Sequence, residues 1–145
     1  MKTKRFTYIV LIITLLVVGF AFMNVHHAKK ELQASIDQTF KSNIGRVLDS
    51  LSLKASEDSY RMILASVLSA ASMAEITTFE ANNDDLDIAL HNLFIALRNE
   101  QSREKVLQRT QELHDLFFKL MTSPDSREAT DKLLQIANET FFKAN

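Results

Sequence analysis

The chain has 145 residues, of which 46% are hydrophobic and 24% are charged, and its formal net charge at pH 7 is −1. It contains two glycines and one proline, so it lacks the turn residues that a β-sandwich or β-barrel needs. The absence of cysteine excludes disulfides, iron–sulfur clusters and thiolate zinc sites. The balanced charge argues against nucleic acid as a partner, because nucleic-acid-binding domains usually carry a basic excess.

An uncharged run occupies residues 6–25, directly after a basic tail at residues 1–5 that contains Lys2, Lys4 and Arg5. A helix of this length is about 30 Å long, which matches the hydrocarbon core of a bilayer. A run that is apolar on every side is difficult to bury in a small domain. The sequence therefore predicts a transmembrane anchor at residues 6–25.

A cleaved signal peptide is the alternative interpretation of this run. Its apolar core is usually about 7–15 residues long and ends in a site of the form small-x-small. Gly19 and Ala21 form the one acceptable site, and the apolar run continues beyond it through Phe22. An uncleaved anchor explains the whole length better, and a secreted helical protein stays open as the second interpretation.

The distribution of basic residues predicts the orientation of the anchor. Three basic residues precede the run, and two, Lys29 and Lys30, follow it. Because basic residues favour the cytoplasmic side, residues 1–5 are predicted in the cytoplasm and residues 26–145 outside it. We expect a single-pass protein of a bacterial cell membrane, with the bulk of the chain extracytoplasmic.

Helical periodicity continues beyond the anchor. Apolar residues recur every three or four positions from Ile36 to residue 55, a spacing typical of one helix face. Ser56, followed by two acidic residues, is a candidate helix start. The pattern leaves open whether residues 28–79 form one helix or two.

Further boundaries follow in the second half of the chain. Residues 62–74 are too few to cross a membrane and are expected to form a buried helix. A break is predicted near Asn82, with Asp84 as the cap of the next helix and Asp87 in its first turn. Ser102 is a candidate restart, and Ser123 with Pro124 is expected to begin the last helix. The predicted fold class is all-α, with the anchor followed by an antiparallel bundle of three or four helices.

No motif for catalysis is present. The sequence contains no His-Glu-x-x-His pattern, Gly-rich phosphate loop or Gly-x-Ser-x-Gly motif. Asn83, Asp85 and Asp87 alternate as at the start of a calcium loop, but the central glycine is missing and Phe94 replaces the closing glutamate. We expect no enzymatic activity, cofactor or metal.

Acidic residues are concentrated in one stretch. No lysine or arginine occurs between residues 62 and 97, which contain five acids: Glu75, Glu80, Asp84, Asp85 and Asp87. This cluster is a candidate docking surface for a basic partner. The alternative is a solvated turn whose acids stabilise the start of a helix.

Small residues recur every seven positions through and beyond the anchor. The candidate dimer seam consists of Thr14, Ala21, Ala28 and Ser35. Small residues allow two helices to approach closely, so a homodimer through this seam is the second candidate interaction.

These features favour one function class over two others. The preferred interpretation is a membrane-anchored interaction or regulatory protein whose partner is another membrane or envelope protein, or a second copy of itself. The alternatives are an extracytoplasmic ligand-sensing four-helix bundle that signals through a partner, and a secreted helical protein.

Overall fold

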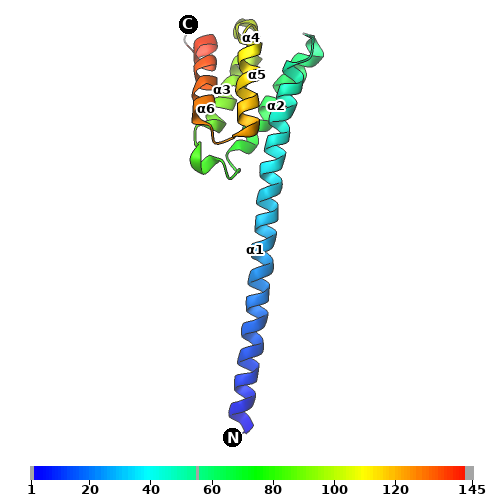
Figure 1. Cartoon of the computed structure of the whole chain (residues 1–145), viewed down its shortest axis with the longest axis vertical. Helices are drawn as coiled ribbons and strands as arrows, with labels where there is room; N and C mark the ends of the chain where they lie inside the picture. The colour runs from blue at the N-terminus through cyan, green and yellow to red at the C-terminus, as the bar shows by residue number, and fades with distance from the viewer. Residues whose placement is uncertain (1, 55, 143–145) are drawn as a thin grey trace. The chain divides into compact units, whose positions relative to one another are not determined.

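A computed structural model describes the backbone of residues 2–54 and 56–142, and the side chains of residues 11, 13–54 and 56–141. In this part of the chain every regular element is helical (Figure 1). The all-α prediction is therefore confirmed. The elements are α1 (Lys2–Leu51), α2 (Glu57–Ala74), the short 3₁₀ helix η1 (Glu80–Asn82), α3 (Leu86–Arg98), α4 (Glu100–Leu107), α5 (Thr110–Thr122), α6 (Arg127–Ala137) and the π-helical turn η2 (Asn138–Phe142).

The chain divides into two compact units. The first ends at Ser35 and the second begins at Ile36, so the first unit contains only residues of α1. Among the described side chains, no helix has a stretch that is both long and apolar enough to cross a membrane. Residues 6–10 and 12 of the predicted anchor lie outside the described side chains.

The second unit is organised around α3, which packs against α2, α4 and α6. Leu90, Leu93 and Leu97 of α3 are completely buried. The part of α1 in this unit contributes Phe40 and Ile44, which are also fully buried. The unit thus contains five complete α-helices and one end of α1, where the sequence predicted three or four helices.

The connection between α1 and α2 shows that residues 28–79 do not form one continuous helix. Helix α1 ends at Leu51, and α2 begins after Ser56, whose side chain accepts a hydrogen bond from the Ser59 backbone N–H at 3.1 Å. The Ser59 hydroxyl accepts the Ser56 N–H at 2.9 Å in return. This reciprocal cap confirms the predicted helix start, and residues 28–79 contain two long helices.

Three predicted helix starts are wrong by one to three residues. Asn99, instead of Ser102, caps α4, because its side chain accepts the Gln101 N–H at 2.9 Å. The Ser102 hydroxyl is buried and donates to the Ala96 carbonyl at 2.6 Å. A further break between α4 and α5 was not predicted.

The last helix also begins later than predicted. Ser123 ends α5, Pro124 lies in the following turn, and α6 begins at Arg127. The residue preceding α3 is Asp85, so the prediction of Asp84 as its cap is wrong.

A long-range contact joins the two connections that precede α3 and α6. Asn83 is 2% exposed, and its Nδ2 donates to the Pro124 carbonyl at 2.9 Å and to Thr130 Oγ1 at 2.8 Å. One buried amide thus ties the α2–α3 connection to the α5–α6 connection and to α6. Its partners lie more than 40 positions away, beyond the reach of local cap chemistry.

Replacing Asn83 should therefore destabilise the second unit much more than replacing its neighbour. Asn83→Ala leaves the Pro124 carbonyl and the Thr130 hydroxyl without their donor, which should lower the free energy of unfolding by about 2 kcal/mol. The Asn82 side chain is exposed, so Asn82→Ala should change it by less than about 0.5 kcal/mol. Urea unfolding followed by far-UV circular dichroism measures both, and equal losses would contradict the role given to Asn83.

Ion pairs join α5 to α6 at the surface. Glu128 of α6 accepts hydrogen bonds from Lys119 of α5 and, at 3.1 Å, from Lys132. These two bonds, that from Lys119 first, lower the pKa of the Glu128 carboxyl to about 2 from its ordinary value of 4.5. The folded state therefore favours the ionised form of Glu128.

The sign of the resulting pH dependence follows from this shift. A carboxyl whose pKa is lowered by folding adds stability above its unfolded pKa, and this is lost as the pH falls from about 4.5 towards 2. Glu128→Gln should remove that part of the acid destabilisation and leave a flatter profile below pH 5. Because the side chain is 63% exposed, the difference should be small and should weaken in high salt. Unfolding curves at several pH values measure it, and parallel profiles for both proteins would contradict the assignment.

Candidate interaction surfaces

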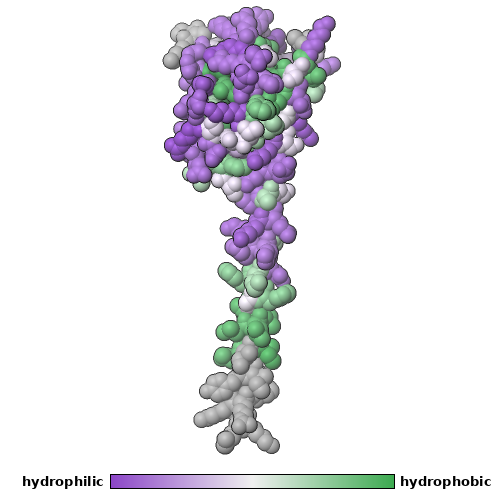
Figure 2. Space-filling model, viewed as in Figure 1, coloured by the Kyte–Doolittle hydropathy of each residue, from purple (hydrophilic) through white to green (hydrophobic). Residues whose placement is uncertain are grey.

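The first surface surrounds α1 in the first unit. Ten large apolar side chains among residues 11 and 13–25 are more than half exposed. They include Leu15, Leu16, Val17 and Val18, which are 62–69% exposed. Successive helical residues are about 100° apart, so four adjacent residues cover all sides of the helix. On the face seen in Figure 2, hydrophobic residues predominate along this segment.

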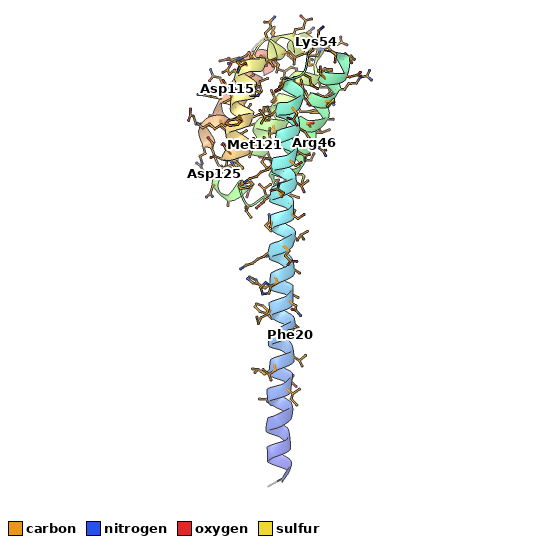
Figure 3. All side chains as sticks on the ribbon, turned by 45° about the vertical axis from the view of Figure 1, so that its right-hand side comes forward. Phe20, Arg46, Lys54, Asp115, Met121 and Asp125 are labelled. Carbon is orange, nitrogen blue, oxygen red and sulfur yellow. The ribbon has the colours of Figure 1, made fainter. Side chains whose placement is uncertain are left out.

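The labelled Phe20 illustrates the same point for one side chain. It extends outward from the ribbon of α1 in Figure 3 and is 69% exposed. Exposed polar residues, among them Lys29 and Lys30, follow this segment along α1. The apolar surface is therefore bounded by basic residues on its C-terminal side.

The predicted dimer seam lies on this same part of α1. Thr14, Ala21, Ala28 and Ser35 are all exposed, and a spacing of seven residues brings them close to one line along a helix. The larger residues between them, such as Val18 and Val25, are exposed as well, at 62% and 69%. Pairing of two chains along the seam stays a prediction.

The second surface is the acidic connection between α2 and α3. Glu75 follows the last residue of α2, Glu80 begins η1, and Asp84 and Asp85 directly precede α3; all four are exposed. Asp87 lies in the first turn of α3, as predicted, and is half-buried. The fold thus keeps four of the five predicted acids available at the surface.

The fold also brings a base to these acids. Arg127, the first residue of α6, places Nη2 3.9 Å from Asp84 Oδ1, and its Nε donates to the Asn82 carbonyl at 2.8 Å. Asp125, in the connection that Asn83 ties to this region, adds another exposed acid (Figure 3). Neither residue could be assigned to this surface from the sequence, because both are about 40 residues away in the chain.

The third surface is the outer face of α2, which was expected to be buried. Ile63, Val67 and Ala70 face the core, but Met62 is 49% exposed and Leu68 is 39% exposed. No charged residue lies between Arg61 and Glu75, so this exposed face is weakly apolar. Alanine and serine occur on both sides of α2, and for this reason the sequence could not separate them.

Candidate metal-ligating side chains are dispersed in the described part of the chain. No group of three or more histidine, cysteine or acidic side chains there is arranged to hold a metal ion. His91 places Nδ1 2.9 Å from the Asp87 carbonyl within the same helix.

Comparison with known proteins does not assign the chain to a family. No protein-family model matches the chain, and no curated protein or solved structure matches it either. The surfaces described above are therefore the basis for any functional argument.

The role of the acidic connection in partner binding can be tested separately from its effect on stability. Replacing Glu80, Asp84 and Asp85 together by Gln, Asn and Asn should change the free energy of unfolding by less than about 0.5 kcal/mol, because all three are exposed. The same variant should reduce recovery of a basic partner after crosslinking in cells, and residual binding should weaken with salt.

A matched variant controls for net charge. Asp49, Glu104 and Asp131 are exposed acids outside the connection, and neutralising them should leave partner recovery unchanged. Equal recovery with both triple variants would show that the connection is only a solvated turn.

Proposed function

We propose that this protein is a single-pass, membrane-anchored helical interaction or regulatory protein that acts through protein–protein contacts at the outer face of a bacterial cytoplasmic membrane. The observation that carries the proposal is the exposure of apolar side chains on all sides of α1 between residues 11 and 25. Soluble monomers rarely expose contiguous apolar patches larger than a few hundred Å². A lipid bilayer covers such a helix on every side, whereas a protein partner usually covers one side.

The charges around the apolar run support the same proposal. In the sequence, Lys2, Lys4 and Arg5 precede the run, and Lys29 and Lys30 follow it. Lysine and arginine at both ends of a membrane helix extend their charged groups towards the lipid headgroups. The excess on the N-terminal side favours an N-terminus in the cytoplasm.

The second unit supplies the surface for protein contacts. Residues 36–145 contain 12 basic and 17 acidic residues, so this unit is acidic although the whole chain is nearly neutral. We propose that its partner is a membrane or envelope protein with a basic surface, which would dock at the acidic connection between α2 and α3. A second copy of the chain, joined through the α1 seam, is the other partner that we propose.

Membrane attachment is tested by fractionation. The full-length protein should stay with the membrane pellet after high-salt and carbonate washes. Val18→Lys combined with Leu16→Arg should move it to the supernatant, because each charge at the centre of a membrane helix costs about 2.5–3.5 kcal/mol on insertion scales. Val18→Leu with Leu16→Val should leave it in the pellet. A soluble wild-type protein, or one found in the medium with Phe22 at its N-terminus, would contradict the anchor.

Orientation is tested with reporters fused after Asn145. A reporter that is active only after export should function there, and a reporter that is active only in the cytoplasm should not. The reason is the basic excess at residues 1–5, and moving Lys2, Lys4 and Arg5 to follow Lys30 should reverse the pattern. Cytoplasmic activity of the unaltered fusion would refute the proposed orientation.

A further inference from the structure

A cavity of about 180 Å³ lies in the second unit, where the end of α1, the start of α2 and the α4–α5 connection meet. Lys54, labelled in Figure 3, marks the α1–α2 connection beside it. Nine of the described residues line the cavity: Ser50, Leu51, Leu53, Ser56, Ser59, Tyr60, Ile63, Leu107 and Thr110.

The burial of these residues distinguishes a closed floor from an open mouth. Ser50, Leu51, Ser59 and Ile63 are at most 7% exposed, so they form the floor. Leu53 is 52% exposed and therefore lies at the mouth. A small molecule can thus enter from solvent and be covered on most sides.

The lining sets the charge and the size of the ligand. None of the nine residues is charged, and an ion without a charged partner would lose its hydration without compensation. Four of them are aliphatic, namely Leu51, Leu53, Ile63 and Leu107. A cavity of about 150 Å³ lined by such side chains holds one benzene molecule, so this cavity has room for a neutral molecule of about one substituted ring.

The hydroxyl groups in the lining specify the polar group of the ligand. Ser50 Oγ donates to the Arg46 carbonyl at 2.7 Å, and Tyr60 Oη donates to the Leu97 carbonyl at 2.9 Å. Thr110 Oγ1 donates to the Leu107 carbonyl. Each hydroxyl has a single proton, which is already engaged, so these oxygens offer further hydrogen bonding only as acceptors. A ligand with an O–H or N–H group can donate a hydrogen bond to one of these oxygens, and a hydrocarbon cannot.

We propose that this cavity binds a neutral, ring-sized molecule with one hydrogen-bond donor, of which phenol is the simplest representative. The proposal is independent of membrane attachment and of the acidic connection. It places a small-molecule site where the end of α1, the start of α2 and the α4–α5 connection meet.

The test compares three probes on the full-length chain: phenol, toluene and benzoate. Methyl NMR of isoleucine- and leucine-labelled protein should show saturable shifts for Leu51, Ile63 and Leu107 with phenol. Toluene has a similar size and no donor, and it should bind about fivefold more weakly, as expected for one lost hydrogen bond. Benzoate should cause no saturable shift.

Variants separate the cavity from the rest of the surface. Leu107→Trp fills the cavity and should abolish the phenol shifts of Leu51 and Ile63, while Ile88→Trp, at a 48% exposed site on α3, should not. Tyr60→Phe with Thr110→Val keeps the shape and removes two of these three acceptors, so it should weaken phenol binding and leave toluene binding nearly unchanged. Far-UV circular dichroism checks that each variant is folded. The proposal is overturned if phenol causes no saturable shift, if toluene binds more tightly than phenol, or if Leu107→Trp leaves phenol binding intact.

Discussion

Helix α1 has an exposed apolar surface in one part of its length and a buried apolar surface in another. The function proposed for the protein depends on this difference. Near its start, α1 exposes apolar side chains such as Phe20 and Phe22, at 69% and 73%. Further along the same helix, Phe40 and Ile44 are fully covered by the second unit. Burial of a large apolar side chain contributes about 1.5–3 kcal/mol, so the exposed segment represents a large unfavourable surface in water. The proposed bilayer is the solvent that removes this penalty on all sides at once.

Beyond the first unit, a few polar contacts join connections that are distant in the sequence. Asn83 joins the α2–α3 connection to the α5–α6 connection, and Arg127 reaches the same region from the start of α6. These contacts hold a short acidic segment at the surface, where Asp84 pairs with Arg127. The side chains of Glu80 and Asp85 are exposed and are well suited to recognise a partner, because exposed charges contribute little to stability.

Much of the helical arrangement could be predicted from local patterns. The scarcity of glycine and proline excluded β folds, and the apolar spacing placed Phe40, Ile44 and Val47 on the face that is now seen to be buried. Ser56 was identified as a helix start, because its hydroxyl and that of Ser59 cap α2 within four residues of chain. These features depend on residues that are close together in the chain, so they could be predicted from local sequence patterns.

Features set by distant contacts were missed. The starts of α3 and α6 depend on Asn83 and its partners in another part of the sequence. The cavity joins Ser50 to Thr110 across 60 positions, and Arg127 joins the acidic segment from more than 40 positions away. The exposed face of α2 could not be predicted from the sequence, because its alanine and serine residues are equally suited to a core and to a surface. No hydrophobicity pattern could have indicated these arrangements.

The central claim, that lipid covers residues 11–25, can be measured directly because the chain has no native cysteine. Single cysteines at consecutive positions from Leu11 to Val25 can carry spin labels in the full-length protein reconstituted into liposomes. Power saturation with oxygen and with a polar nickel complex then reports the surroundings of each label. The account predicts high oxygen and low nickel accessibility at all positions, with the greatest depth near the middle of the run. High nickel accessibility, or a periodicity of 3.6 residues with one side protected from both reagents, would contradict it by showing water or a protein partner in place of lipid.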